Sequence, residues 1–381
     1  MIKAGYKETE LGEIPEEWEI VDLNNVADYY NGYPFEPTQW ETYGTPIIRI
    51  QNLTGSSNVI NYFNGLLESR YRISNGDLLL SWSATLNVYI WHGGDAYLNQ
   101  HIFKVLPKKN IDKMYLYNVL GIVIRKLKNE VHGSTMKHFV KSALSLVNVP
   151  VPPSYEQQKI AKILLDTDAL ISSLDELITK KQNIKTGLMQ ELLTKGIGHT
   201  EFKDTEIGRI PKEWELKALK DIYRIKYGKS PKKSNYGTTP VIGSSGVYSH
   251  TNIFLAESGA IVIGRKGNAG KVYFINKECW PSDTTFYIEP INLLISTFTY
   301  YYLFNLNISG NDAKTTLPSL QKGTLESIPL IIPSLVEQKK IADILSDIQQ
   351  EIEALEQKRE KYKMIKSGLM QQLLTGKVRV K

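Results

Sequence analysis

The sequence is poor in cysteine and in long apolar runs. Cys279 is the one cysteine among 381 residues, which excludes an intramolecular disulfide framework and any metal site built from a cysteine cluster. No apolar run approaches the ~20 residues that a membrane-spanning helix needs, and the N-terminal stretch MIKAGYKETELGEIP lacks the apolar centre of a signal peptide. We therefore expect a soluble, cytoplasmic protein that has no membrane contact, with Cys279 as a buried apolar filler.

Motifs of catalytic and nucleotide-binding sites are also lacking. The stretch GRKGNAGKV at 264–272 has Val272 where a phosphate-binding loop needs Ser or Thr, and it lacks the Gly-x-Gly spacing of a dinucleotide-binding turn. The stretch VPPSY at 151–155 departs from the Asn-Pro-Pro-Tyr of adenine methyltransferases, and Asp283 and Glu289 have no lysine at the spacing of a nuclease. The six histidines show no close metal-ligand pairing. We predict a protein with no catalytic residue, no cofactor and no metal of its own.

What the sequence does contain is an internal duplication. Residues 152–194 return as residues 333–375, with EQ, IA and GLMQ recurring at an offset of 181. In each copy, apolar residues at alternating steps of three and four predict one long amphipathic helix. The expected stripes are Ile160, Leu164, Thr167, Ile171, Leu174, Ile178, Lys181, Leu188 and Leu192 in the first copy, and Ile341, Leu345, Ile348, Ile352, Leu355, Tyr362, Ile365, Leu369 and Leu373 in the second.

The ends of both helices are marked as well. Pro153 and Pro333 stand at the entrances, where a helix tolerates proline, and Gly196 and Gly376 stand just past the ends. Each helix is expected to be roughly 60 Å long, too long for one small domain. Because the chain supplies two equal helices, we favour an antiparallel intramolecular coiled coil. Ordinary core helices, or a coiled coil that joins two chains, remain open as alternatives.

A second repeat precedes each long helix. ELGEIPEEWEI at 10–20 returns as EIGRIPKEWEL at 206–216, so that Trp18 matches Trp214 at an offset of 196, and Gly32 later matches Gly228. We expect both tryptophans to hold the chain against the helix ends. The two halves thus share the segments at their start and end but differ in between, which indicates a duplicated scaffold that carries two different inserts.

Each insert is predicted to be a compact α+β domain with a curved, mainly antiparallel or mixed sheet. Residues 75–91 and 258–275 each form an apolar strand, a polar turn and a second strand. A further strand and a helix follow in both inserts, the helices at 114–129 and 293–307.

The turns of the inserts are the candidate binding sites. A net charge of +6 and a pI near 8.9 are compatible with a polyanionic partner without demanding one. Arginine and asparagine can read guanine and adenine edges, and lysine can hold phosphates, although a solvated turn has the same composition. The candidates in the second insert are Lys229, Lys232, Lys233, Ser244, Ser245, Arg265, Lys266 and Asn268. Those in the first insert are Arg49, Gln51, Asn52, Trp82, Ser83, Thr85 and His101. Because the two sets differ, two DNA-binding inserts would read different sequences.

This layout resembles the specificity subunit of type I restriction-modification systems over essentially the whole chain. The resemblance rests on GEIPEEWE and GRIPKEWE before the inserts, PPSYEQQKIAKIL and IPSLVEQKKIADIL after them, and the helix ends LMQELLT and LMQQLLT. It implies two target-recognition domains, each reading one half of a split site in double-stranded DNA, separated by two conserved helices with pseudo-twofold symmetry. The expected domains are 1–151 and 197–332, with spacer helices at 152–196 and 333–381.

The resemblance also implies partners. Two modification subunits that bind S-adenosylmethionine dock on the paired helices, and restriction subunits that act as motor and nuclease, and use ATP and Mg²⁺, complete the complex. The chain itself would carry no cofactor. Two other classes of function stay open from the residues alone: a fused restriction and methylation enzyme, and a coiled-coil scaffold that binds only proteins.

Overall fold

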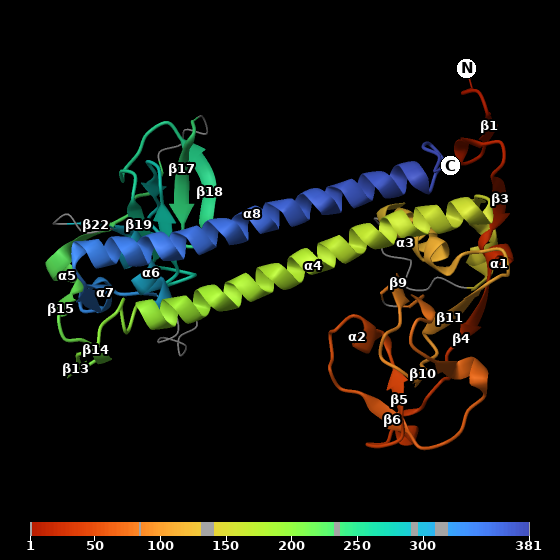
Figure 1. Ribbon diagram of the computed structural model, residues 1–381, viewed down its shortest axis with the longest axis horizontal. Coiled ribbons are helices and arrows are strands. Elements are labelled where there is room, and N and C mark those ends of the chain that lie inside the picture. Colours follow the sequence, from red (N-terminus) through yellow and green to blue (C-terminus); the bar gives the residue numbers. More distant parts are fainter. Residues whose placement is uncertain are drawn as a thin grey trace. The chain divides into compact units, whose positions relative to one another are not determined.

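The computed structural model describes residues 2–83, 85–130, 141–231, 237–290, 296–308 and 319–380. The chain divides into two compact units (Figure 1). Unit 1 comprises Met1–Leu174 and Lys358–Lys381, and unit 2 comprises Asp175–Gln357. Both units therefore contain part of each long helix, α4 (Ser154–Leu192) and α8 (Leu335–Leu373).

Unit 1 holds twelve strands and three further α-helices among its described residues. The strands are β1 (Tyr6–Thr9), β2 (Gly12–Pro15), β3 (Glu19–Asp22), β4 (Ala27–Asn31), β5 (Thr45–Ile48), β6 (Asn61–Phe63), β7 (Arg72–Ile73), β8 (Leu78–Ser81), β9 (Asn87–Ile90), β10 (Ala96–Leu98), β11 (Ile102–Pro107) and β12 (Asn148–Val151). The helices are α1 (Leu23–Val26), α2 (Ile50–Leu53) and α3 (Lys113–Glu130), with short 3-10 turns at Pro37–Gln39, Ser69–Tyr71 and Lys141–Leu146.

Unit 2 repeats the main elements in the same order, without counterparts of α2 and β7 among its described residues. Its strands are β13 (Phe202–Thr205), β14 (Gly208–Pro211), β15 (Glu215–Ala218), β16 (Tyr223–Tyr227), β17 (Thr239–Gly243), β18 (Gly246–Thr251), β19 (Ala260–Gly264), β20 (Val272–Ile275), β21 (Trp280–Pro281), β22 (Thr285–Pro290) and β23 (Pro329–Ile332). Its further helices are α5 (Leu219–Ile222), α6 (Ser296–Asn305) and α7 (Lys322–Glu326).

The two units share one sheet topology. An antiparallel sheet of order β4-β11-β8-β9 in unit 1 corresponds to β16-β22-β19-β20 in unit 2. Beside it lies a mixed sheet of shorter strands, the small sheet, with the order β6-β5-β10-β7 in unit 1 and β18-β17-β21 in unit 2. In this sheet β5 pairs in parallel with β10, as β17 does with β21. The predicted α+β class and the predicted duplication are thereby confirmed, including both strand–turn–strand segments.

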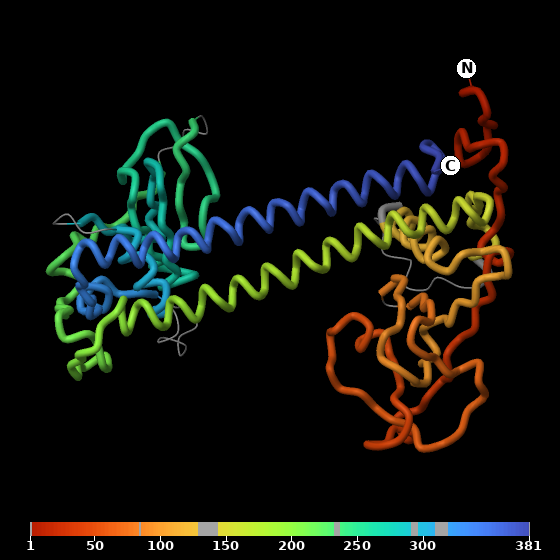
Figure 2. Tube along the Cα trace, in the orientation of Figure 1, coloured from red at the N-terminus to blue at the C-terminus, as the bar shows by residue number. Residues whose placement is uncertain are grey.

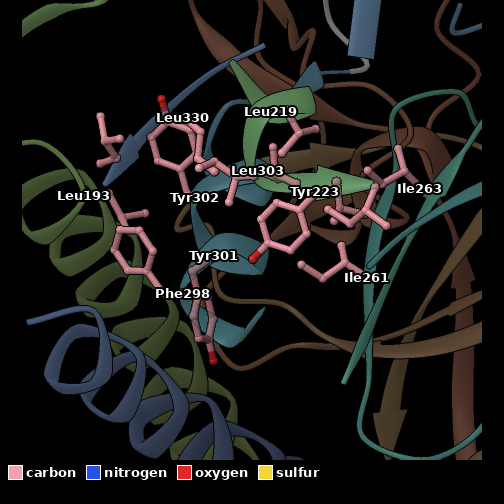
Figure 3. Packing of buried hydrophobic residues seen from close by; sticks show 14 of the residues in the cluster. Leu193, Leu219, Tyr223, Ile261, Ile263, Phe298, Tyr301, Tyr302, Leu303 and Leu330 are labelled. Atoms are coloured by element: carbon pink, nitrogen blue, oxygen red, sulfur yellow. The ribbon is translucent and has the colours of Figure 1, made fainter. Parts of the chain in front are cut away.

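Apolar residues on successive positions of the central strands are buried because both faces of the main sheet are covered. In β19, Ile261 and Ile263 face one cluster, which includes α6 and both long helices, whereas Val262 faces another cluster under the small sheet. Figure 3 shows the first of these clusters, where Phe298 and Tyr301 of α6 lie between the sheet and the long helices. Such a strand reads as a continuous apolar run, since neither face meets water.

Cys279 belongs to the cluster under the small sheet of unit 2. The side chain is fully buried, and this burial raises the pKa of its thiol to about 11. The thiol is therefore protonated at neutral pH, in agreement with the predicted role as an apolar filler.

The long helices pair antiparallel within the chain. In unit 2, Lys181 Nζ binds Glu351 Oε2 at 2.5 Å, and Lys185 Nζ donates to Gln349 Oε1 at 2.6 Å. The residue numbers of the partners in α8 thus fall as those in α4 rise, which is the pattern of an antiparallel pair. In unit 1, Lys366 Nζ binds Asp168 Oδ1 at 2.6 Å. Each helix has 39 residues, which gives the expected length of roughly 60 Å.

Two details of the predicted helices are decided by the structure. Ile365 was expected on the buried stripe, but its side chain is 41% exposed, so this assignment is wrong. The stripe shifts here because the buried positions of the last two turns include Met370 and Leu374 beside Leu373. Gly196 and Gly376 have φ of +68° and +72°, the left-handed conformation expected just past a helix end.

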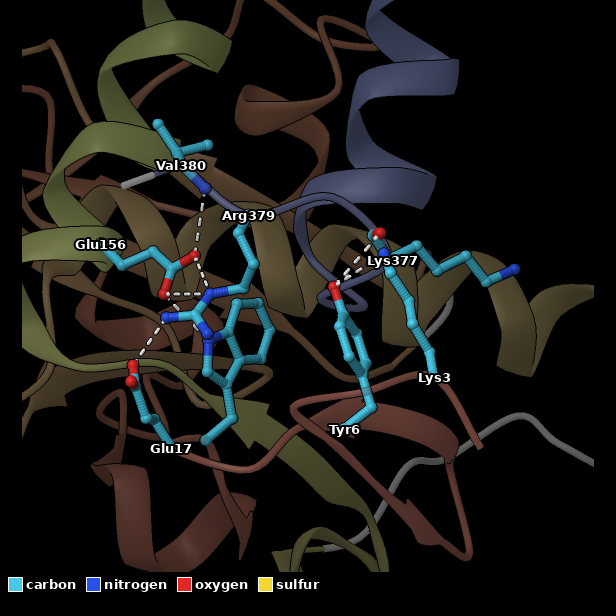
Figure 4. A network of polar contacts seen from close by, with 8 residues as sticks. Lys3, Tyr6, Glu17, Glu156, Lys377, Arg379 and Val380 are labelled. Atoms are coloured by element: carbon cyan, nitrogen blue, oxygen red, sulfur yellow. Dashed lines mark hydrogen bonds and ion pairs between the residues drawn. The ribbon is translucent and has the colours of Figure 1, made fainter. Parts of the chain in front are cut away.

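A buried carboxylate fixes the start of α4 in unit 1. Glu156 is fully buried, and its Oε2 accepts a hydrogen bond from Trp18 Nε1 at 3.0 Å. The C-terminal tail completes the network, since Arg379 Nε donates to Glu156 Oε1 at 2.9 Å and Arg379 Nη2 donates to Glu17 at 2.7 Å (Figure 4). Val380 N also donates to Glu156 Oε1, at 3.1 Å. The hydrogen bonds of Arg379 to Glu156 and Glu17 raise the pKa of Arg379 above its ordinary value, so the guanidinium stays charged.

Unit 2 has the same tryptophan–glutamate hydrogen bond at the start of α8. Trp214 Nε1 donates to Glu337 Oε2 at 2.9 Å, and Glu337 Oε1 accepts from Ile197 N at 2.9 Å and contacts His199 Nε2 at 2.9 Å. The repeated Trp and Glu of the sequence are thus one hydrogen-bonded pair in each unit. The prediction that Trp18 and Trp214 hold the chain against the helix ends is confirmed.

The first and last segments of the chain lie side by side in unit 1 (Figure 2). The hydroxyl of Tyr6 in β1 donates to the carbonyl of Lys377 at 3.4 Å. In the part of the chain that the structure describes, no helix is long and apolar enough to cross a membrane. Across the same residues there is no cluster of three or more His, Cys, Asp or Glu side chains able to hold a metal ion.

Candidate nucleic-acid interface

A tightly packed glycine marks the same place in both units. A Cβ added to Gly32 would overlap the carbonyl oxygen of Asn99, and one added to Gly228 would overlap that of Ser282. Gly32 N donates to Ile102 O at 3.0 Å, and Gly228 N donates to Thr285 O at 3.0 Å. The matched glycines therefore mark a close backbone approach between the chain just past β4 or β16 and the segment just before β11 or β22.

The residues that follow keep the same backbone bonds but have different side chains. Tyr33 N donates to Leu98 O at 2.7 Å in unit 1, and Lys229 N donates to Pro281 O at 3.0 Å in unit 2. One backbone position thus presents a tyrosine in one unit and a lysine in the other.

The turn after the central strand shows the same relationship. Trp82 N, just after β8, donates to His101 O at 3.2 Å, and Arg265 N, just after β19, donates to Thr284 O at 2.8 Å. Trp82 and Arg265 therefore occupy equivalent positions. The correspondence proposed from the sequence between the turns at 82–87 and 264–271 holds at the level of backbone hydrogen bonds.

In unit 2 the turn side chains form a compact group. Arg265 Nη2 donates to Asp283 O at 2.8 Å, and its guanidinium lies 5.4 Å from the ring centre of Tyr227 and 6.0 Å from that of Phe286. Asn268 Nδ2 donates to Ser245 Oγ at 3.1 Å. The β17–β18 turn and the β19–β20 turn are thus brought together, as the candidate residues require.

Not all the lysines near this group are free to bind a polyanion. Lys229, Lys266 and Asn268 are exposed. Lys226 binds Glu289 at 2.6 Å, and this hydrogen bond raises the pKa of Lys226, so its charge is compensated locally. The candidates Lys232 and Lys233 lie outside the described residues.

In unit 1 the equivalent turn is aromatic. The ring of Trp82 lies edge-on to that of His101, with centres 5.3 Å apart, and 5.8 Å from that of Phe103. Ser83 and Thr85 are joined by a backbone bond of 2.6 Å from Thr85 N to Ser83 O. Four of the candidates predicted for the first insert therefore cluster at one end of the main sheet.

The remaining candidates of unit 1 form a second group at the start of α2. The guanidinium of Arg49 lies 4.6 Å from the ring centre of Trp40. Asn52 is occupied by its own loop, since its Oδ1 accepts from Arg49 N at 3.0 Å and its Nδ2 donates to Val59 O at 2.8 Å. Gln51 is half-buried beside them. The structure gives Asn52 a loop-stabilising role that the sequence did not indicate.

Buried nitrogen atoms without a hydrogen-bond partner occur at several candidates. Among the described residues they include Arg49 Nε, His101 Nδ1 and Arg265 Nε. Buried polar groups are nearly always paired in folded proteins. Unpaired buried oxygen atoms also occur at described residues away from the turns, for example Asn118 Oδ1 and Gln338 Oε1, so this feature does not single out the candidates.

Sequence reasoning missed further side chains beside the turns. A hollow of about 530 Å³ next to Trp82 is lined by Arg70, Tyr71 and Gln100, together with Tyr29, Tyr30, Asn31, Gly32 and Pro34. In unit 2, the ammonium group of Lys322 lies 5.9 Å from the ring centre of Tyr227. Tyr227 is the residue directly before the tightly packed Gly228. The position before Gly32 and Gly228 was a usable signal in the sequence, whereas Arg70 stands in a segment with no recognisable counterpart.

Comparison with known proteins assigns the family. The model of the type I restriction modification DNA specificity domain matches residues 15–186 and again residues 211–363, which together make up most of the chain. The chain belongs to this family. The two matches coincide with the two halves of the duplication, so the chain carries the specificity domain twice.

Curated relatives of this specificity-domain chain have the same extent. It is 29% identical over 414 residues to the type I restriction enzyme MjaVIII specificity subunit of Methanocaldococcus jannaschii, covering 100% of this chain and 97% of that protein. It is 24% identical over 424 residues to the MjaIX specificity subunit of the same organism, covering 98% and 96%. Specificity subunits of type I systems are noncatalytic DNA-recognition subunits, and membership of the family places this chain among them.

Solved structures share the fold of this specificity-domain chain. The S subunit of a type I restriction-modification system from M. genitalium has a TM-score of 0.64 at 16% identity, covering 94% of this chain and 96% of that one. A chain from a structure titled for the complex assembly and conformational transition of the type I R-M system has a TM-score of 0.55 at 16% identity, covering 96% and 99%.

Proposed function

We propose that this chain selects the DNA target of a type I restriction-modification complex, with each recognition domain reading one half of a bipartite site. The observation that carries the proposal is the shared frame around Gly32 and Gly228. Identical backbone bonds hold Trp82 in one unit and Arg265 in the other. A duplicated frame with different side chains at its turns suits two half-sites of different sequence.

The proposed DNA contacts fall into two classes. Arg265 and Asn268 have the donors and acceptors that read base edges, and Lys229 and Lys266 are exposed cations suited to phosphates. In unit 1, Trp82 and His101 offer an aromatic face and a ring nitrogen. We assign the two recognition domains to residues 1–151 and 197–332, and the spacers to residues 152–196 and 333–381.

The partners follow from the same proposal. Two modification subunits dock on the paired helices and supply S-adenosylmethionine, and restriction subunits supply the ATP- and Mg²⁺-dependent steps. The complex acts on double-stranded DNA in the cytoplasm. The absence of cofactor motifs from the sequence of this chain supports placing the cofactors on partner subunits.

The test is co-expression of this chain with the modification subunit of its own system in a methylation-free host, followed by single-molecule mapping of methylated adenines. We expect one split motif that disappears when the chain is omitted. Methylation by the purified chain alone would favour a fused enzyme. A stable complex that leaves no methylated or protected half-sites would favour a protein-binding scaffold.

Lengthening the helix pair is expected to lengthen the gap between the half-sites. Asp168 pairs with Lys366 and Lys181 pairs with Glu351, so an insertion at 172–179 needs a matching insertion between 351 and 366. One added heptad in both helices keeps the stripe and adds about 10 Å. This corresponds to about three base pairs at 3.4 Å each.

Methylation mapping checks this prediction. The half-site sequences should stay the same, because the recognition turns lie elsewhere in the chain. The matched control carries the heptad in α4 alone and should lose the pairing and the methylation. An unchanged gap in the doubly extended protein would rule out the helices as the ruler.

A further inference from the structure

Each long helix contains a glycine that the fold does not require. Gly187 in α4 and Gly368 in α8 occupy the same place in the repeat. A Cβ added at either position would meet nothing within 4 Å, and neither glycine has a positive φ. Glycine is one of the least favourable residues inside a helix. Neither local packing nor backbone conformation explains why both copies have it.

The same helix face presents an exposed isoleucine one turn earlier in both copies. Ile184 is 42% exposed in α4, and Ile365 is 41% exposed in α8. Each lies three residues before its glycine, and residues three apart are neighbours on a helix surface. An exposed aliphatic side chain thus lies beside a glycine in each unit, and that glycine is exposed in unit 2 and half-buried in unit 1.

A matched lysine extends this face by a further turn. Lys180 and Lys361 lie four residues before the isoleucines. Within the described part of the chain neither has an ion-pair partner, although the nearby Lys181 and Lys366 do. We call each set, Lys180, Ile184 and Gly187 in unit 2 or Lys361, Ile365 and Gly368 in unit 1, a glycine face.

The glycine faces are not the surfaces through which the helices pair. In unit 2 the pairing uses Ile178, Lys181 and Lys185. At 3.6 residues per turn these lie on a different side of α4 from Lys180, Ile184 and Gly187. Among the described residues, the glycine faces are therefore not used for pairing between the long helices.

We infer that each glycine face is the docking surface for an α-helix of one modification subunit. The inference rests on the proposed function and names the surface by which the partner is held. A missing Cβ lets a second helix approach closely, since interaxial distances depend on the side chains at the crossing. The isoleucine packs beside that crossing, and the lysine pairs with a carboxylate on the partner helix.

The duplication identifies the occupant as one protein bound twice. The recognition turns differ between the halves, as Trp82 and Arg265 illustrate, whereas the glycine faces keep the same three residue types at the same spacing. A surface that is kept in both halves of a duplicated chain fits two copies of the same partner, which is the stoichiometry proposed for the modification subunit.

The test uses the full chain and the purified modification subunit of its own system. Gly187→Leu and Gly368→Leu are each expected to weaken one docking site roughly tenfold, so that two bound subunits become one at concentrations near the wild-type Kd. The double variant should weaken both sites. Sedimentation velocity gives the stoichiometry, and titration calorimetry gives the affinities. Lys180→Glu should weaken one site by repelling the expected carboxylate.

The matched control is Thr186→Leu, which introduces the same side chain at an exposed position that belongs neither to the glycine face nor to the pairing residues Ile178, Lys181 and Lys185, and which should bind as the wild type does. Leucine favours a helix more than glycine and meets open space, so helicity and Tm of the glycine variants should equal or exceed those of the wild type.

Wild-type affinity in the double variant, or equal losses in the control, would overturn the inference while leaving the recognition role intact. Self-association of the chain alone that the glycine variants abolish would overturn it as well, in favour of a contact between copies. Failure of the proposed function would instead show as absence of chain-dependent methylation in the wild type.

Discussion

Replacing Glu156 by alanine is expected to destabilise unit 1 by about 3–5 kcal/mol, as removal of one member of a buried ion pair does. The carboxylate is fully buried and accepts bonds from Trp18, Arg379 and Val380. Alanine would leave the indole N–H and the guanidinium of the tail without their partner. Hydrogen exchange followed by mass spectrometry measures the loss within unit 1, where a global melt would mix the two units.

Glu17→Ala is the matched control, because it removes a carboxylate bound to the same arginine at a mostly exposed position. It should cost less than about 1 kcal/mol, as exposed pairs do. Equal effects of the two substitutions would show that the buried network does not hold the start of α4. Protection in peptides of unit 2 should be the same in both variants.

Replacing Arg265 by alanine is expected to weaken DNA binding by about 1–3 kcal/mol, which is about 5- to 150-fold. The guanidinium is positioned by Asp283 and by the rings of Tyr227 and Phe286, so a base contact made by it loses little side-chain freedom. The loss should be confined to one half of the site. Methylation mapping of the reconstituted complex should then show one half-site relaxed and the other unchanged.

Trp82→Ala is the mirror experiment, because this residue occupies the equivalent position in unit 1. It should affect the other half-site and leave the first unchanged. Lys212→Ala serves as the neutral control, since it removes only an exposed pair with Glu201. A uniform loss across all sequences in the Arg265 variant would assign the residue to phosphate binding instead of base reading.

The architecture followed from the sequence because its signals were local and occurred twice. The apolar stripes predicted the long helices, and the polar turns at 82–87 and 264–271 predicted the hairpins that the structure contains. The second copy of each signal turned a weak pattern into a specific one. The stripe went wrong at Ile365, where periodicity alone could not tell a paired face from an exposed one.

The site was less predictable because its geometry depends on residues far apart in the chain. The bond from Asn268 to Ser245 joins two turns, and the bond from Arg379 to Glu156 spans 223 positions. No local pattern encodes such contacts. Arg49, Gln51 and Asn52 were chosen for their position near the repeated turns, but the contacts of Arg49 and Asn52 are with Trp40 and with their own loop.

The contact of Arg379 with Glu156 has a consequence for how the protein is made. Unit 1 needs residues from both ends of the chain, whereas unit 2 is one continuous stretch, Asp175–Gln357. Arg379 is synthesised after the whole of unit 2, so the N-terminal half cannot close around Glu156 until unit 2 has been made, while unit 2 can fold earlier. This reverses the usual order in which the domain made first folds first. A chain cut before Arg379 would therefore lose contacts made by its first half, at Glu17 and Glu156, although Arg379 is 362 positions from Glu17.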